Sequence, residues 1–322
     1  RPLLDRMEVI ELTSYTDDEK LEIAKQYLLP RQMKEHGITK RSLRLGDETI
    51  RAVITGYTRE SGVRSLERLM GKLCRKTAMR LVAGDIKRVA VTEANLEEFL
   101  GPRRYLPPVL DRDPVGVVNG LAWTEAGGEL LEVEVNVMEG TGKLELTGNL
   151  GDVMKESAQA AVSCIRSRAA QLGVDPGFYK NRDIHIHFPE GAVPKDGPSA
   201  GVAITTALVS ALTGRKVHSD VAMTGEVTLR GRVLAIGGLK EKTMAAKRNG
   251  IRTVILPKEN QRDLTEIDPV VRQSLRFVAA ESIDSVLGEA LYKLEPKAEQ
   301  EEEMIAAFLP TEAVVKDSSL RQ

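Results

Sequence analysis

The hydrophobic pattern of this chain changes where two breaks lie close together, at Gly101-Pro102 and Pro107-Pro108. Before the breaks, apolar residues recur at helical spacing, most clearly between Gly62 and Leu81. After them, apolar and polar residues alternate as in a half-buried strand, for example over residues 131–137. A change of period across Gly and Pro residues is typical of a domain boundary. We predict an α+β chain, with a helical domain at 1–101, a linker at 102–112 and a mixed α/β domain at 113–293.

The composition supports a folded chain with no strong charge bias. The 322 residues are 42% hydrophobic and only 4% aromatic, and 46 Lys and Arg balance 47 Asp and Glu. This balance excludes a strongly basic nucleic-acid binder, and the few aromatics argue against base stacking as the main function. Residues 294–322 hold 3 basic and 7 acidic residues, so we predict an acidic tail that is partly ordered at most.

The sequence also carries signals about its compartment. No apolar run reaches the roughly 18 residues of a membrane span, and we find no signal peptide. Cys74 and Cys164 form no disulfide framework and no metal-ligand spacing, so each is expected to be a small buried residue. We therefore expect a cytoplasmic protein. The chain starts at Arg1 rather than Met, and its first residues already resemble the middle of a domain, so we also expect a fragment of a longer chain.

His185 and His187 lie two residues apart on a predicted strand and therefore share one face. They are either a metal pair or catalytic base, or they have a structural, site-shaping role. No Asp, Glu or Cys cluster accompanies them at a local metal-ligand spacing, which favours the second interpretation. We predict no metal site.

The run Gly140-Thr141-Gly142-Lys143 suggests a phosphate-binding loop at first sight. That motif needs Gly five residues before the Gly-Lys pair and Ser or Thr after the Lys. Val137 and Leu144 occupy those two positions. A hairpin turn is therefore the better interpretation.

The strongest local signal is Gly197-Pro198-Ser199-Ala200-Gly201, which contains the pattern G-x-S-x-G. Small neighbours leave the Ser199 hydroxyl accessible, and an apolar helix is predicted to begin there. The free N–H groups and the positive end of that helix suit an oxyanion site. An ordinary N-cap serine after a Gly-Pro turn explains the same residues equally well.

A nucleophilic serine needs a base. The one downstream histidine, His218, lies among charged residues, and no strand precedes Ser199 as it does in an α/β-hydrolase elbow. A lysine is the other option if burial lowers its pKa by roughly three units. On a helix, Lys242 falls in one stripe with Leu239 and Ala246, whereas Lys240 does not. Lys242 is therefore either a desolvated base or an ordinary helix lysine whose amine reaches water.

Six segments in this order and spacing resemble the Lon protease family over residues 1 to about 293. They are Gly120–Thr124, Thr147–Gly151, His185–Gly191, Lys195–Gly201, Thr224–Gly231 and Gly237–Lys242. The resemblance implies a serine endopeptidase with a Ser199–Lys242 dyad, in which Lys242 takes the Ser199 proton and later passes it to the leaving amine.

The same resemblance implies supporting roles around the dyad. Thr224 matches a threonine whose hydroxyl holds the lysine. Asp196 and Gly197 match a loop whose rearrangement opens or blocks the site. His185 and His187 match a strand beside the catalytic pocket, which agrees with a site-shaping role.

Residues 1–101 are similar to the small helical lid of the AAA+ ATPase module of that family. In this interpretation Arg64 reaches a nucleotide phosphate, and Arg6 is an arginine finger offered to a neighbouring subunit. Walker motifs are absent from this sequence. We therefore expect no cofactor in the fragment, and ATP with magnesium only in the intact enzyme.

The resemblance further implies an intact enzyme that degrades unfolded or damaged proteins as a homohexameric ring. It also allows weak DNA binding by residues 1–100, which hold 19 Lys and Arg against 16 Asp and Glu. The fragment is expected to cleave unstructured polypeptides without ATP hydrolysis. Two alternatives stay open: a serine esterase with an α/β-hydrolase elbow, and a non-catalytic AAA+ oligomerisation module.

Overall fold

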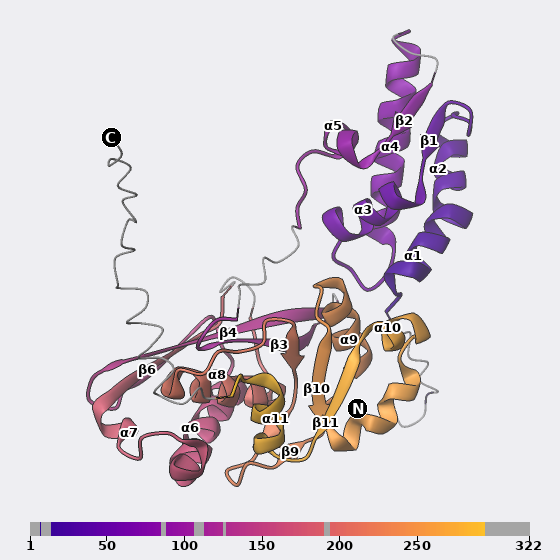
Figure 1. Ribbon diagram of the computed structural model, residues 1–322. Coiled ribbons are helices and arrows are strands. Elements are labelled where there is room, and N and C mark those ends of the chain that lie inside the picture. The colour runs from indigo at the N-terminus through magenta and orange to yellow at the C-terminus, as the bar shows by residue number, and fades with distance from the viewer. Residues whose placement is uncertain are drawn as a thin grey trace, which may run out of the picture.

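The computed structural model describes Met7 and residues 14–84, 88–105, 113–124, 127–189 and 194–293. It contains a helical part, residues 14–105, and a mixed sheet and helix part, residues 113–293 (Figure 1). Each part buries a hydrophobic core of its own. Arg6, residues 106–112 of the predicted linker and the predicted acidic tail lie outside the described residues. No helix in the described ranges is long and apolar enough to cross a membrane.

The helical part packs its helices around α4, which buries Leu66, Met70 and Leu73 on one face. Its elements are α1 (Asp17–Ile23), α2 (Leu29–Glu35), β1 (Leu43–Leu45), α3 (Asp47–Tyr57), α4 (Arg64–Val82), β2 (Val89–Val91) and α5 (Leu96–Leu100). The Thr16 side chain accepts the Glu19 N–H, and the Glu19 carboxylate accepts the Thr16 N–H, which is a capping box.

The mixed part is built on a sheet of seven strands in the order β11-β10-β7-β3-β4-β6-β5. The strands are β3 (Val117–Thr124), β4 (Gly127–Glu139), β5 (Leu144–Thr147), β6 (Arg182–His187), β7 (Val221–Met223), β10 (Thr253–Pro257) and β11 (Arg276–Ala280). Strands β3, β7, β10 and β11 run parallel, whereas β4 is antiparallel to both of its neighbours. A separate short pair is formed by β8 (Glu226–Val227) and β9 (Val233–Leu234).

Helices cover both faces of this sheet (Figure 1). Val118 of β3 belongs to the core shared with α6 (Asp152–Leu172), α8 (Gly201–Thr213) and α11 (Ile283–Ala290). Leu121, on the opposite face of the same strand, packs in the core of α9 (Leu239–Arg248) and α10 (Pro269–Ser274). Because α8 is buried along most of its length, it is apolar on nearly every side. A short helix, α7 (Phe178–Asn181), precedes β6.

Two local predictions are wrong. Residues 140–143 do not join a hairpin, because β6 lies between β4 and β5 and pairs with both. The Asp183 carboxylate accepts the N–H groups of three consecutive residues of that loop, and these bonds lower its pKa. The second concerns Asp47, which the sequence predicts as the N-cap of a helix through Ile50 and Val53. In the structure Gly46 is the N-cap of α3, and Asp47 is its first helical residue.

Candidate active site

Ser199 lies in a single 3₁₀ turn (Pro198–Ala200) that leads directly into α8. Gly197 precedes this turn with a φ of 125° and a ψ of 157°, a backbone conformation that is essentially restricted to glycine. Ser199 is partly exposed, while Ala200 and the first turns of α8 are buried. Ser199 therefore occupies the accessible N-terminal end of a buried helix, where the helix dipole is positive.

Lys242 lies on the buried stripe of α9, as its helical spacing with Leu239 and Ala246 predicts. Its side chain is only 3% exposed. Burial disfavours the charged ammonium and lowers the pKa of Lys242 to about 8. A substantial fraction of this amine is consequently neutral near physiological pH.

Thr224 connects the two elements that carry Ser199 and Lys242. It follows β7 directly and is completely buried. Its Oγ1 accepts a hydrogen bond from Lys242 Nζ at 3.1 Å and donates one to the Ser199 carbonyl oxygen at 3.4 Å. The neighbouring Gly225 N–H donates to the same carbonyl at 2.9 Å. The start of α8, the end of β7 and the buried face of α9 thus meet at one point.

Asp196 fixes the segment that leads into Ser199. Its Oδ1 accepts the N–H of Met154 in the first turn of α6 at 3.0 Å, and that of Gly197 at 2.9 Å. Lys195 is paired with the chain next to β5, because its N–H donates to Asn149 O and its carbonyl accepts from Gly151 N. The loop before Ser199 is therefore bonded both to a helix N-terminus and to a strand extension.

His185 and His187 meet a common hydroxyl on β5. Thr147 Oγ1 lies 2.8 Å from His185 Nε2 and 2.7 Å from His187 Nδ1. A hydroxyl has a single proton, so one of these ring nitrogens accepts it and the other must donate. Within the described residues, no group of three His, Cys, Asp or Glu is placed to hold a metal ion. The geometry is that of a bonded pair that joins two strands.

Of the two arginines predicted for nucleotide, Arg64 lies away from this cluster and Arg6 is outside the described residues. Arg64 is the first residue of α4 in the helical part and is exposed. The N–H groups of Thr141, Gly142 and Lys143, which a phosphate loop would aim at its ligand, are bonded to the Asp183 carboxylate. The described residues thus offer one arginine but no phosphate-binding loop.

Comparison with known families identifies the family to which this chain belongs. The profile for the Lon protease (S16) C-terminal proteolytic domain matches residues 90–293, and that for the Lon protease AAA+ ATPase lid domain matches residues 34–89. The chain belongs to the Lon protease family. Its helical part is the lid domain, and its mixed part is an α/β protease domain, as the resemblance predicted.

Individual relatives agree with this assignment. The chain is 60% identical to a Lon protease of Finegoldia magna over 290 residues, and 56% identical to Lon protease 1 of Bacillus subtilis over 292 residues. Each alignment covers 90% of this chain, but only 37% and 38% of the respective relative. A Lon protease of Heliobacterium modesticaldum is 51% identical over 324 residues, which cover 100% of this chain and 40% of that protein.

Sequence reasoning missed two contacts of this Lon-type site. Thr147 was not singled out, although its hydroxyl joins both histidines. Gly151 was not singled out either, although a Cβ at this position would lie 2.3 Å from Asp196 Cγ. Both residues belong to the segment Thr147–Gly151 that resembles the family, but nothing local in this segment identifies a partner about 40 residues away.

We predict that Gly151→Ala destabilises the protease domain through Asp196 alone. Gly151 is the N-cap of α6 with an unstrained φ of −70°, so the added methyl disturbs only the carboxylate that caps the helix. The expected loss is about 1–2 kcal/mol in the free energy of unfolding, measured with urea. Gly46→Ala is the matched control, because Gly46 caps α3 with a φ of −88° and nothing lies within 4 Å of an added Cβ. Equal losses in the two variants would contradict the prediction.

We predict that Lys242→Met raises stability near neutral pH. The folded pKa of about 8 lies below the ordinary value of 10.5, so the unfolded chain binds more protons between these values. The free energy of unfolding of the parent should therefore rise with pH through this window, and below it the penalty should reach about 3 kcal/mol.

Urea unfolding between pH 7 and pH 10 checks this expectation. Lys242→Met should lose the rise with pH and should be more stable than the parent at pH 7. Lys143→Met, which removes an exposed amine, is the control. A parent and a Lys242→Met variant with the same pH dependence would show that the lysine is not desolvated.

Proposed function

We propose that this chain is a serine endopeptidase that uses Ser199 as nucleophile and Lys242 as general base. The observation that carries the proposal is the buried amine of Lys242. It is hydrogen-bonded to Thr224, whose hydroxyl is in turn bonded to the Ser199 carbonyl. The Lon protease relatives support a peptidase activity. Because the chain spans well under half of their length, the activity of a whole Lon protein is a separate proposal.

The bonding of Thr224 favours the neutral amine as a proton acceptor. One Lys242 N–H donates to Thr224 Oγ1, and the Thr224 proton is directed to the Ser199 carbonyl. Thr224 therefore accepts from the amine without competing for its lone pair. In the proposed reaction that lone pair takes the Ser199 proton as the hydroxyl oxygen attacks the peptide carbonyl.

The proton then moves to the leaving amine. As the tetrahedral intermediate collapses, the Lys242 ammonium gives its proton to the amine nitrogen, and an ester on Ser199 remains. Lys242 next takes a proton from water, whose oxygen attacks the ester. As the second tetrahedral intermediate collapses, Lys242 returns this proton to Ser199 Oγ, and the carboxylic acid product leaves. The positive end of the α8 dipole beside Ser199 would stabilise the oxyanion in both steps.

The esterase alternative requires a histidine base. His218 packs against the Tyr292 ring, with 3.9 Å between the ring centroids, and none of its described contacts reaches Ser199. His185 and His187 are bonded to Thr147. The geometry therefore favours the lysine as the base.

For the intact protein we propose ATP-dependent degradation of unfolded proteins by a ring of subunits in the cytoplasm. Arg64 would then bind a nucleotide phosphate, with the phosphate loop, the magnesium site and an arginine finger such as Arg6 completing the ATPase centre. Of these ATPase groups, the described part of this chain contains only Arg64. The chain alone should therefore cleave unstructured polypeptides without hydrolysing ATP.

We predict that Ser199→Ala and Lys242→Ala each lower the cleavage of an unstructured protein by about 10³-fold or more, because each removes half of a proton-transfer pair. Cleavage is measured with a fluorescently labelled casein-type substrate, and folding is checked by urea unfolding. Ser163→Ala, which changes an exposed serine of α6, should retain full activity. Substantial activity in either dyad variant would remove that residue from the mechanism.

A peptidyl boronate separates the peptidase from the non-catalytic module, since it forms a covalent adduct only with an activated serine. We expect one adduct, at Ser199, in the parent and none in Ser199→Ala. An unlabelled parent would favour the non-catalytic alternative.

We also predict a graded effect at Thr224. Thr224→Ser keeps the hydroxyl and should retain cleavage within a few-fold, whereas Thr224→Val removes it and should lower kcat by about 10–100-fold. Because Thr224 Oγ1 accepts from the amine and stabilises its charged form, Thr224→Val should also move the rising limb of the pH profile to lower pH, which a merely destabilised variant would not do. Equal rates for the serine and valine variants would exclude such a role.

A further inference from the structure

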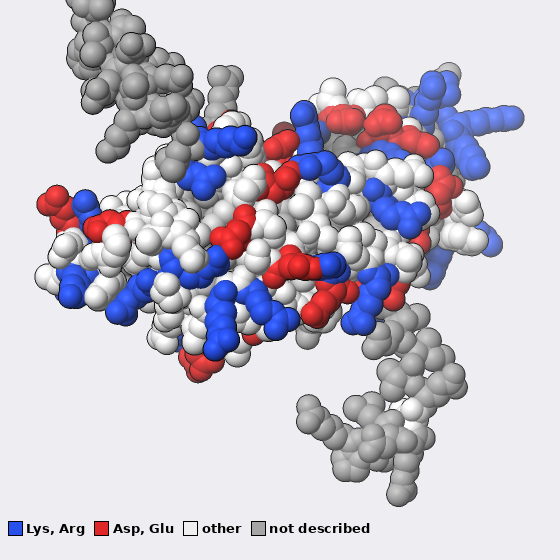
Figure 2. Space-filling model, turned by 60° about the horizontal axis from the view of Figure 1, so that its bottom comes forward, with Lys and Arg blue, Asp and Glu red and all other residues white. Residues whose placement is uncertain are grey.

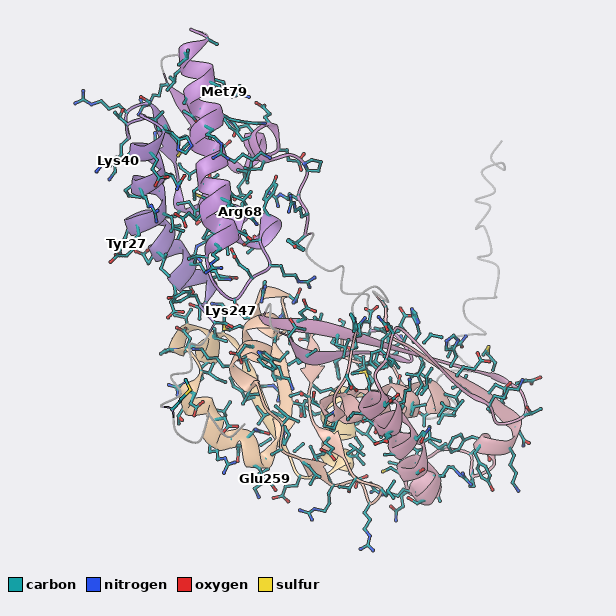
Figure 3. The ribbon with its side chains drawn as sticks, turned by 180° about the vertical axis from the view of Figure 1, so that it is seen from behind. Tyr27, Lys40, Arg68, Met79, Lys247 and Glu259 are labelled. Carbon is teal, nitrogen blue, oxygen red and sulfur yellow. The ribbon has the colours of Figure 1, made fainter. Side chains whose placement is uncertain are left out.

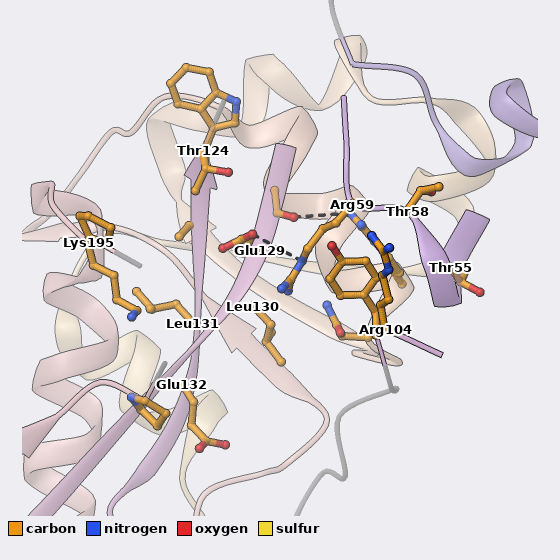
Figure 4. Close-up of a pocket in the computed structure, with 18 of the residues that line it drawn as sticks. Thr55, Thr58, Arg59, Arg104, Thr124, Glu129, Leu130, Leu131, Glu132 and Lys195 are labelled. Atoms are coloured by element: carbon orange, nitrogen blue, oxygen red, sulfur yellow. Dashed lines mark hydrogen bonds and ion pairs between the residues drawn. The ribbon is translucent and has the colours of Figure 1, made fainter. Parts of the chain in front are cut away.

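A cavity of 630 Å³ lies where the lid domain meets the protease domain (Figure 4). The lid contributes Thr55, Gly56, Thr58, Arg59 and the segment 103–105 to its wall. The protease domain contributes the facing ends of β3 and β4 and the start of the loop before Ser199. Figure 4 shows Arg59 and Arg104 on one side of this space and Lys195 on the other.

The cavity ends next to the proposed nucleophile. Pro194, Lys195 and Asp196 line it, and Asp196 precedes Ser199 by three residues. Three residues of extended chain span about 10 Å at most. A polypeptide bound at Ser199 therefore needs to extend only a few residues to enter the cavity. Apolar side chains such as Leu131 and Met154 supply part of its surface.

Two arginines of the cavity lack an acidic partner among the described residues. Arg59 pairs with Glu129 at 3.4 Å, and Arg103 pairs with Glu93 at 3.4 Å. Arg104 is exposed and forms no ion pair in the described part of the chain. Arg248 donates one long hydrogen bond, 3.4 Å from Nη2 to Gly128 O, and its buried Nε has no hydrogen-bond partner among the described residues. A buried, unpartnered guanidinium N–H indicates that an acceptor is missing.

A second cavity of 340 Å³ continues this basic surface onto the lid. It shares Arg59, Arg104 and Tyr105 with the first cavity. It adds three cations of α4 at positions i, i+4 and i+7, and no Asp or Glu lines it; the added cations are Arg68, Lys72 and Arg75. Their side-chain contacts are with neutral groups: Ser65 Oγ, Leu100 O and the His36 ring. Arg68 is labelled on α4 in Figure 3.

Cations predominate among the charged residues that line the two cavities. Five cations and three acidic residues, Glu129, Glu132 and Asp196, line the first cavity, whereas all charged residues among the lining of the second are Lys or Arg. Figure 2 shows a face of the molecule on which blue and red side chains are interspersed, in agreement with a net charge of only −1. A concave surface with an excess of one sign of charge between low-dielectric walls focuses its field on an incoming ligand.

We infer that the two cavities form a substrate subsite for an acidic, extended polypeptide segment. The inference rests on the proposed peptidase function, because the subsite leads to Ser199. Asp or Glu side chains a few residues from the scissile bond are received by Arg104 and Arg248. Further acidic residues lie along Arg68, Lys72 and Arg75. The position of the first cavity beside the catalytic loop favours a peptide over a nucleic acid as the occupant.

Two labelled peptides test the subsite with the full chain. Both carry the same unstructured cleavage segment, and one flank holds four Glu in the first peptide and four Gln in the second. The parent should cleave the Glu peptide with a kcat/KM about 5–10-fold higher, through a lower KM, and added salt should erase the difference. The double variant Arg68→Gln/Arg104→Gln should lose this advantage and cleave the Gln peptide as the parent does. Both arginines are exposed, so their loss should not unfold the chain.

Arg252→Gln is the control, since Arg252 is exposed on the protease domain outside both cavities, and it should keep the preference. Equal kcat/KM for the two peptides in the parent overturns the subsite.

A binding assay tests the subsite independently of catalysis. Fluorescence anisotropy of the labelled Glu peptide should show that it binds to Ser199→Ala, and adding Arg68→Gln/Arg104→Gln to this variant should weaken the binding about 5-fold or more. Binding without cleavage in the parent would reject the dyad but keep the subsite. An oligo-dT that binds the cavities while the Glu peptide does not would overturn the peptide assignment.

Discussion

The chemistry proposed for this chain depends on keeping one lysine amine out of water. An ammonium is costly to bury without a counter-ion, and the fold gives Lys242 a hydroxyl partner but no carboxylate in the described contacts. Burial shifts the equilibrium toward the neutral amine, and the contact of a neutral amine with a buried threonine hydroxyl is one that an apolar pocket can tolerate. A carboxylate in the place of Thr224 would stabilise the ammonium and remove the base.

The same constraint explains which part of the site the sequence reveals. Helical spacing placed Lys242 on an apolar stripe, and the structure buries that stripe. The small residues around Ser199 and the apolar helix after it placed the serine at a helix start. These signals are local, because periodicity and small-residue turns act over a few residues. The elements that carry the site were predictable for that reason.

Long-range pairings left no comparable signal. The loop 140–143 was predicted as a hairpin, but β6, which follows some 40 residues later, inserts between β4 and β5. The cap of α6 by Asp196 joins residues 42 positions apart, and the only local trace of it is a glycine at position 151. Turn residues describe the loop itself, while its pairing depends on which surface the later strand covers. Family resemblance supplied what periodicity could not: the association of Ser199, Thr224 and Lys242.

Helix α9 links Lys242, the proposed base, to the lid as well as to the sheet. Lys247, five residues after Lys242, lies 3.5 Å from Asp18 of α1, where the two parts of the molecule meet (Figure 3). Asp18 also binds Arg51 at 2.7 Å, and these bonds lower its pKa. Such partly exposed ion pairs each contribute at most about 1 kcal/mol, so this contact is adjustable.

The other end of α9 is held far more rigidly. An added Cβ at Gly128 would lie 1.9 Å from the Glu241 carbonyl oxygen, and one at Gly238 would lie 3.0 Å from the Trp123 ring. The first turn of the helix is therefore packed directly on strands β3 and β4, whereas its last turn contacts the lid through the ion pair of Lys247 with Asp18. Lys242 is the fourth residue of α9 and lies at the packed end. Its buried contact with Thr224 therefore depends on the packing of α9 against the sheet and not on the weak contact with the lid.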